Sequence, residues 1–188
     1  MKRMLLVGAL TAACLSVLAY GTAAYFTAQD TAQNVITAGN IAVALKETAL
    51  PADGGDPVPF EDVIGVMPGT EVSKIVQVEN TGDHPAYIRI RVDKALTLAQ
   101  GQEDAIDLDL VGLDIDTAHW TEKDGYYYYN QPLAAGDITP PLFTQVSFSK
   151  EMDDRYQDGR AAITVLVSAT QAENNGDTAL QAAGWPVE

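Results

Sequence analysis

The chain has 188 residues, with 26 acidic and 11 basic side chains and a formal net charge of −15. This length suits one domain with a full hydrophobic core, at about 100–200 residues per domain. The negative charge disfavours binding to nucleic acid and to anionic membranes. The one cysteine leaves no pair for an internal disulfide.

Residues 1–24 are predicted to be a secretory signal peptide. Lys2 and Arg3 form a basic start, an apolar run follows, and small residues precede the expected cleavage site between Ala24 and Tyr25. Signal peptidase is then a partner during export, and Cys14 is lost with the signal. The mature chain keeps 164 of the 188 residues, with nine basic and all 26 acidic side chains, so its charge becomes −17.

This segment has two other possible interpretations. One is a retained membrane anchor, because residues 4–24 just reach the roughly 20 apolar residues that span a bilayer. The other is a lipoprotein modified at Cys14, although Thr11 stands where that motif needs an apolar residue. With cleavage after Ala24, we expect a secreted protein that has no membrane segment left.

Residues 25–40 form the next unit, which we call the N-terminal arm. It contains Tyr25, Phe26, Val35 and Ile36, has no proline, and carries only Asp30 as a charge. Such a segment can extend and pair its backbone with an open sheet edge, so it is a candidate donor strand for a neighbouring copy of the chain. The alternatives are a disordered terminus and an arm that folds back as an edge strand of its own domain.

Residues 41–188 are expected to form one β-sandwich domain. Apolar residues alternate with polar ones or form short β-branched runs, a pattern typical of strands. The expected strands are residues 41–45, 72–78, 86–92, 107–116, 126–129, 142–148 and 161–170. Residues 51–59 and 174–177 are expected to be a surface loop and a mobile turn, and residues 95–104 and 178–183 short helices. The predicted fold is all-β, a jelly-roll-like antiparallel sandwich with short helices in its loops.

Four consecutive tyrosines, residues 126–129, stand out within this pattern. In a strand they point alternately to the two faces, so two lie on each side. We expect one pair in the core beside Trp120 and the other on the outer face. Stacking of the outer pair on a glycan or on a neighbouring subunit is the alternative.

Several blocks along the chain form a recognisable series: residues 25–31 with Asn34 and 37–40, residues 67–69, 78–82 and 86–89, Trp120 with 124–129, and residues 169–172. Together these blocks resemble the TasA/camelysin family of secreted proteins from Gram-positive bacteria. It implies a jelly-roll subunit that is exported with a dedicated signal peptidase and assembles into biofilm-matrix fibres. The expected partner is the chain itself in a head-to-tail homopolymer, with a minor or anchoring matrix protein as a second one. A monomeric cell-surface binding module or accessory fibre protein is the alternative.

Some members of that family are described as metalloendopeptidases, so an enzyme is a further alternative. The chain has only His84 and His119 and no His-Glu-x-x-His motif, so we expect no catalytic residues, no metal site and no cofactor. Residues 107–118 resemble an EF-hand loop, but Val111 and Ala118 stand where oxygen ligands are needed. The one metal interaction that we still expect is weak calcium binding by carboxylates at contacts between subunits.

Overall fold

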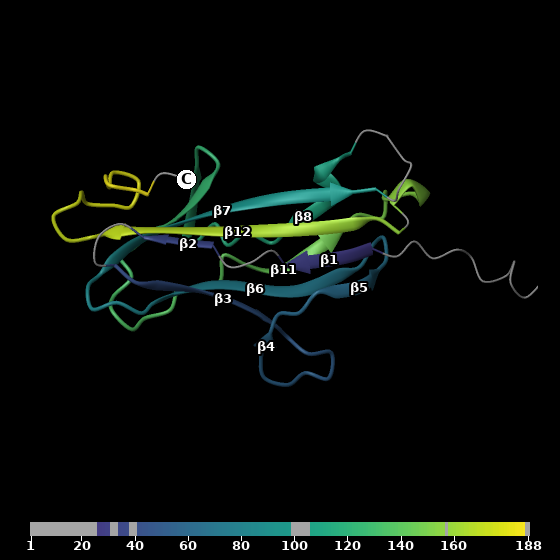
Figure 1. Cartoon of the computed structure of the whole chain (residues 1–188), viewed down its shortest axis with the longest axis horizontal. Helices are drawn as coiled ribbons and strands as arrows, with labels where there is room; N and C mark the ends of the chain where they lie inside the picture. Colours follow the sequence, from purple (N-terminus) through teal and green to yellow (C-terminus); the bar gives the residue numbers. More distant parts are fainter. Residues whose placement is uncertain (1–25, 31–33, 38–40, 99–105, 157, 187–188) are drawn as a thin grey trace, which may run out of the picture.

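The computed structural model describes residues 26–30, 34–37, 41–98, 106–156 and 158–186. Two sheets pack face to face as a sandwich, with β7 and β12 in one layer and β3 and β6 in the other (Figure 1). The larger sheet has the order β5-β1-β12-β7-β10-β9, with β2 also on β12, and the smaller has the order β4-β3-β6-β11-β8. The predicted all-β sandwich is therefore confirmed.

The strands of the larger sheet are β1 (Phe26–Asp30), β2 (Asn34–Thr37), β5 (Val63–Val66), β7 (Ala86–Thr97), β9 (Trp120–Lys123), β10 (Tyr126–Tyr129) and β12 (Arg160–Gln171). Those of the smaller sheet are β3 (Val43–Ala49), β4 (Val58–Pro59), β6 (Glu71–Asn80), β8 (Val111–Leu113) and β11 (Phe143–Phe148). Neighbouring strands are antiparallel, except that β1 and β2 both run parallel to β12.

The antiparallel pair of β7 and β12 is the backbone of the larger sheet. Its register runs without a break from Arg160 opposite Thr97 to Gln171 opposite Ala86. Within β7, Ile88 and Ile90 are fully buried, while Arg89 lies between them on the outer face. Burial of each such aliphatic side chain stabilises the fold by about 1.5–3 kcal/mol, which explains why this alternation fixes which face of the strand meets the core.

The smaller sheet carries an ion pair inside the sandwich that sequence reasoning missed. Lys74 of β6 and Glu47 of β3 lie on the core-facing side of their strands, in line with buried Val76 and Leu45. Lys74 Nζ lies 2.7 Å from Glu47 Oε1, and their side chains are only 2% and 3% exposed. Phe60 closes over the pair, with its ring centroid 3.9 Å from Lys74 Nζ.

The expected strand over residues 107–116 is wrong for most of its length. The segment begins with a 3-10 turn, η1 (Leu108–Leu110), in which Leu108 is exposed together with Asp107 and Asp109. Asp107 begins this turn because its side chain accepts a hydrogen bond from the Asp109 N–H. Only β8 follows as strand, and the residues after it form turns.

The expected helices are also corrected. Residues 95–97 belong to β7, and residues 99–104 of that expectation lie outside the described residues. Residues 178–183 form a hydrogen-bonded turn, in which the Gln181 and Ala182 N–H groups donate to the Thr178 carbonyl. In the described part of the chain, helical structure is confined to η1 and to η2 (Asp154–Tyr156). Among these residues no helix is long and apolar enough to cross a membrane.

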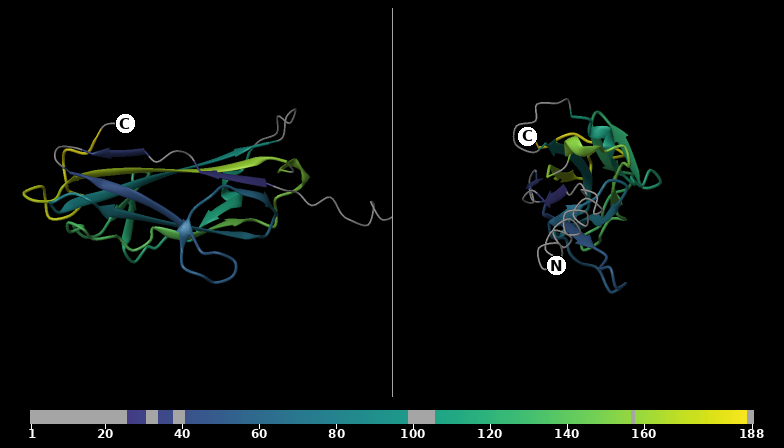
Figure 2. Two further views of the ribbon diagram at one scale, coloured as in Figure 1. Left: turned by 60° about the horizontal axis from the view of Figure 1, so that its bottom comes forward. Right: turned by 90° about the vertical axis from the view of Figure 1, so that its right-hand side faces the viewer.

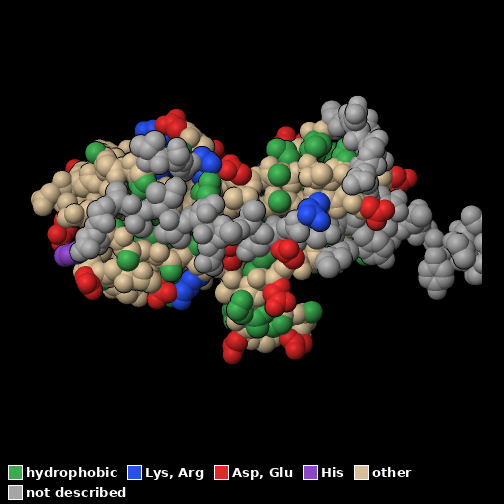
Figure 3. Space-filling model, viewed as in Figure 1, with side chains coloured by type: hydrophobic (Ala, Val, Ile, Leu, Met, Phe, Trp, Pro, Cys, Tyr) green, Lys and Arg blue, Asp and Glu red, His purple; other side chains and the backbone are tan. Residues whose placement is uncertain are grey.

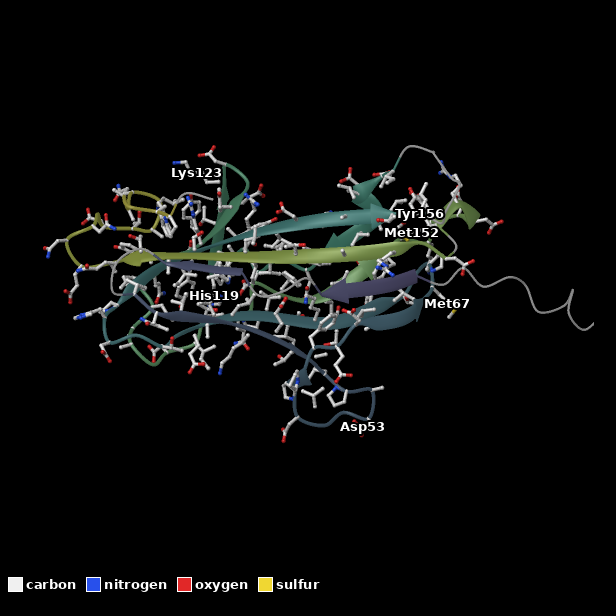
Figure 4. The ribbon with its side chains drawn as sticks, viewed as in Figure 1. Asp53, Met67, His119, Lys123, Met152 and Tyr156 are labelled. Carbon is white, nitrogen blue, oxygen red and sulfur yellow. The ribbon has the colours of Figure 1, made fainter. Side chains whose placement is uncertain are left out.

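The expected surface loop at residues 51–59 is present and stands off from the body of the sandwich (Figure 2). Its return arm contains β4, which pairs with only the last two residues of β3, Thr48 and Ala49. Asp53 lies at the outer end of this loop (Figure 4). Because β4 is so short, this edge of the smaller sheet offers few backbone groups on which another strand could pair.

Candidate assembly surface

The described parts of the N-terminal arm lie along one edge of β12. Residues 27–30 of β1 pair with Arg160 to Ile163, and residues 34–37 of β2 pair with Leu166 to Ala169. Of the residues predicted to form the arm, Phe26 lies in β1, and Val35 and Ile36 lie in β2. Ala24 and Tyr25, between which cleavage is predicted, lie outside the described residues. In the single chain the arm thus folds back onto its own domain, with β2 as the expected edge strand but β1 between β5 and β12. Donation to a neighbour stays a prediction.

β1 lies in a slot between two strands, whereas β2 pairs with β12 alone. On its other side β1 pairs antiparallel with β5, with Phe26 opposite Val66 and Ala28 opposite Val63. If β1 left, β5 would lose the one described strand with which it pairs, and residues 160–163 of β12 would keep a partner strand, β7, on one side only. Unpaired backbone N–H and C=O groups at a buried edge are costly, so the slot requires a strand, whichever chain supplies it.

Apolar side chains line the strands that form this slot. Val66 of β5 and Ala161 and Ile163 of β12 are each at most 4% exposed and belong to the main core. The strands on both sides of the slot therefore carry side chains of the core. An incoming strand would contribute backbone hydrogen bonds beside these buried side chains.

A groove of about 510 Å³ lies beside the start of β5. Its lining is mostly apolar with two carboxylates at the rim, and consists of Ala49, Leu50, Pro51, Val58, Pro59, Glu61, Asp62 and Val63. Leu50 and Val58 are 55% and 46% exposed, a large fraction for aliphatic side chains. Figure 3 shows this part of the loop as a hydrophobic cluster surrounded by acidic side chains.

The four tyrosines of β10 divide between the two faces as predicted. Tyr129 packs against Trp120 in the core, with ring centroids 5.3 Å apart, and Tyr127 packs on the same cluster. Tyr126 and Tyr128 lie on the outer face. Burial raises the pKa of both Tyr127 and Tyr129, with smaller contributions from the Glu122 and Asp137 carboxylates respectively.

The C-terminal segment covers part of that outer face, which sequence reasoning did not foresee. Trp185 packs edge-on against Tyr128 at 5.7 Å, and the Tyr87 hydroxyl donates a 3.0 Å hydrogen bond to the Gly176 carbonyl. Arg89 of β7 lies between the rings of Tyr126 and Trp185. The only sequence signal for the contact of Arg89 with these rings was an arginine on the outward side of one strand and a run of tyrosines in another.

The two histidines lie in turns at separate places in the sequence. The His84 carbonyl accepts a hydrogen bond from Asn80 Nδ2, in the turn after β6. His119 Nδ1 lies 2.6 Å from Asp116 Oδ2, and this hydrogen bond is the main reason that the pKa of Asp116 is lowered. No group of three or more His, Cys, Asp or Glu side chains that could hold a metal ion occurs among the described residues.

Comparisons with known proteins add no relative to this description. No family model, no curated protein and no solved structure matches the chain.

Proposed function

We propose that this chain is a secreted structural subunit of an extracellular biofilm-matrix fibre, and that it assembles by donating its N-terminal arm to the next copy. The observation that carries the proposal is the slot between β5 and β12, which is filled by a strand from the extreme N-terminal side of the same chain. Each copy then has one strand to donate and one slot to fill. The proposal gives the chain no catalytic activity and no cofactor.

Exchange of β1 between copies produces a polymer without new kinds of contact. The donated strand would meet the same residues of β5 and β12 in the neighbour that it meets in its own chain. Because donor and acceptor surfaces differ, the contact is head-to-tail and propagates as a filament unless it closes into a ring. The charge of the mature chain opposes this association, so the strand contact must outweigh repulsion between subunits.

A disulfide placed across the slot tests whether strands are exchanged. Ala28 and Val63 are directly opposite in the antiparallel pair of β1 and β5, where Cβ atoms lie about 4.5–5.5 Å apart. The chain from Tyr25 onward contains no cysteine, so Ala28→Cys with Val63→Cys introduces one defined pair. When the variant is oxidised as a monomer, the disulfide should hold β1 on β5 of its own chain, and electron microscopy should show no filaments. The reduced variant should assemble.

Oxidation after assembly distinguishes donation from other modes of polymerisation. If β1 is exchanged, the filaments of the double variant become covalent ladders on non-reducing gels. The matched control is Ala44→Cys with Glu79→Cys, a directly opposite pair of β3 and β6 within one subunit, and its filaments should release monomers. Filaments of the slot variant that release only monomers would contradict strand donation. Absence of filaments from the unmodified chain at neutral and mildly acidic pH would contradict the fibre function itself.

A further inference from the structure

We propose that the outer face of the larger sheet carries a binding site for carboxylated sugars, such as the uronate units of an acidic polysaccharide. The site is formed by Arg89, Lys123, Tyr126 and Trp185, and we call it the basic aromatic patch. It lies on β7, β9, β10 and the C-terminal segment, apart from the slot of β1. The inference does not depend on fibre assembly.

Arg89 is at the centre of the patch and is held between two aromatic rings. Its guanidinium carbon lies 4.0 Å from the ring centroid of Tyr126 and 4.7 Å from that of Trp185. Both rings and Arg89 are half-buried, so each keeps part of its surface in solvent. Contacts of this kind hold the guanidinium in place through the ring quadrupoles. With its faces in contact with the rings and its Nε buried, Arg89 has only its two Nη groups left to meet a ligand.

The donors of Arg89 are mostly unused. An arginine side chain has five N–H donors, and the one hydrogen bond that Arg89 makes among the described residues runs from Nη2 to the Pro186 carbonyl, at 3.3 Å. Its Nε is buried without a hydrogen-bond partner there, and no described carboxylate forms an ion pair with it. The chain has 26 acidic side chains, yet none of those in the described part of the chain pairs with this arginine.

Lys123 provides a second cation on the same face. It is directly opposite Tyr126 in the pair of β9 and β10, and residues opposite one another share a face of the sheet. Glu122 precedes it and therefore points to the other face. Lys123 is exposed at the end of the hairpin (Figure 4), and it forms no ion pair within the described residues. Cationic and aromatic side chains thus alternate across the patch, in the order Lys123, Tyr126, Arg89 and Trp185.

This alternation selects the class of ligand. A guanidinium edge binds a carboxylate through two parallel hydrogen bonds, and partly exposed tyrosine and tryptophan rings offer flat apolar surface for the face of a pyranose. A uronate unit carries both features on one ring, whereas an acidic peptide supplies the carboxylate without the stacking face. The negative charge of the whole chain repels a long polyanion, so short oligosaccharides are the appropriate probe.

The test is a titration of the mature chain with trigalacturonate, followed by calorimetry and by the side-chain ¹⁵N–¹H signals of Arg89 Nε and Trp185 Nε1. We expect saturable binding that shifts both signals. Lys123→Gln and Arg89→Lys should each weaken it about tenfold, because each removes a charge-assisted or bidentate contact. The matched control is Lys46→Gln, which removes one positive charge from the smaller sheet and should leave the affinity within about twofold.

The competing ligands and outcomes are separated by three further titrations. The methyl ester of trigalacturonate keeps the rings and loses the charge, and it should bind at least about tenfold more weakly. A tri-glutamate peptide keeps the charge and loses the rings, and equal binding of this peptide would overturn the sugar assignment. Absence of saturation up to about 10 mM trigalacturonate, or an equal loss in Lys46→Gln, would overturn the patch as a binding site.

Discussion

The ion pair of Lys74 and Glu47 gives the sharpest test of how the sandwich is held together. We expect Glu47→Leu alone to destabilise the protein strongly, and we expect Glu47→Leu combined with Lys74→Met to restore most of the loss. Both side chains are at most 3% exposed, so the single replacement leaves an ammonium group in an interior that water barely reaches. The double replacement removes both charges and keeps apolar volume at the site.

The magnitude follows from the burial of the pair. Removal of one partner of a buried ion pair costs about 3–5 kcal/mol, whereas replacement of both by apolar residues is often neutral or stabilising by about 1–4 kcal/mol. For a domain of this size, about 1 kcal/mol corresponds to a shift of about 2–4 °C in Tm. The single variant should therefore melt about 10 °C lower than the unmodified chain. The contact of Lys74 with the Phe60 ring, at 3.9 Å, would remain in the single variant and moderates the loss.

The measurement is thermal and urea unfolding of the unmodified chain and the two variants, followed by circular dichroism. Lys46→Met is the matched control, because Lys46 forms its 2.8 Å ion pair with Glu79 at the surface, where such pairs contribute about 0–1 kcal/mol. A single variant that loses less than about 1 kcal/mol, or a double variant as unstable as the single one, would refute the reasoning that loss of the buried Glu47 carboxylate beside Lys74 is the source of the destabilisation.

Two more predictions concern single side chains. The Asp114 carboxylate accepts hydrogen bonds from the Thr144 side chain and the Gln145 N–H. These bonds outweigh the effect of burial and lower the pKa of Asp114 from 3.8. The ionised carboxylate therefore stabilises the folded state above pH 3.8, and this contribution is lost as the pH falls through the lowered pKa. Asp114→Asn should thus be less stable at pH 7 and show a shallower acid unfolding curve, and a curve parallel to that of the unmodified chain would contradict this. Asn175 ties the C-terminal segment down, donating to the Ala183 carbonyl at 3.0 Å and accepting from the Ala183 N–H at 2.9 Å. Asn175→Ala should lower the free energy of unfolding by about 1–3 kcal/mol. It should also shift the fluorescence emission of Trp185 to the red, which is measured in a Trp120→Phe background so that Trp185 is the one emitting tryptophan. An unchanged emission maximum would count against this role.

Most strands of the sandwich were predictable because their signals are local. The alternation around Ile88 and Ile90 fixes both the strand and its buried face, and the structure lengthens that strand to Ala86–Thr97 without changing the pattern. The sequence Asn80-Thr81-Gly82 is typical of a turn. A long-range contact of Asn80, the 2.9 Å hydrogen bond from its Nδ2 to the Leu133 carbonyl, joins residues 53 positions apart and had no local signal.

Errors arose where a local pattern had two solutions. Alternating aspartate and leucine at residues 107–110 is compatible with a half-buried strand, but the Asp107 side chain caps a 3-10 turn instead. The segment at residues 178–183 has helical composition, yet it is held as a turn by its contacts with the preceding strand end and Asn175. In both cases a side-chain hydrogen bond to the backbone competed with regular secondary structure.

The sequence by itself determined the β-rich class, the faces of the main strands and the capacity of residues 25–40 to extend as strand, because hydrophobic periodicity and charge are properties of short segments. Only the tertiary structure decided that the arm lies between β5 and β12, that Glu47 meets Lys74 inside the core, and that Trp185 closes on Arg89. Each of these contacts joins segments far apart in the chain. Their choice depends on which edges, charges and rings remain without partners after the sandwich has formed, and no short window of sequence contains that information.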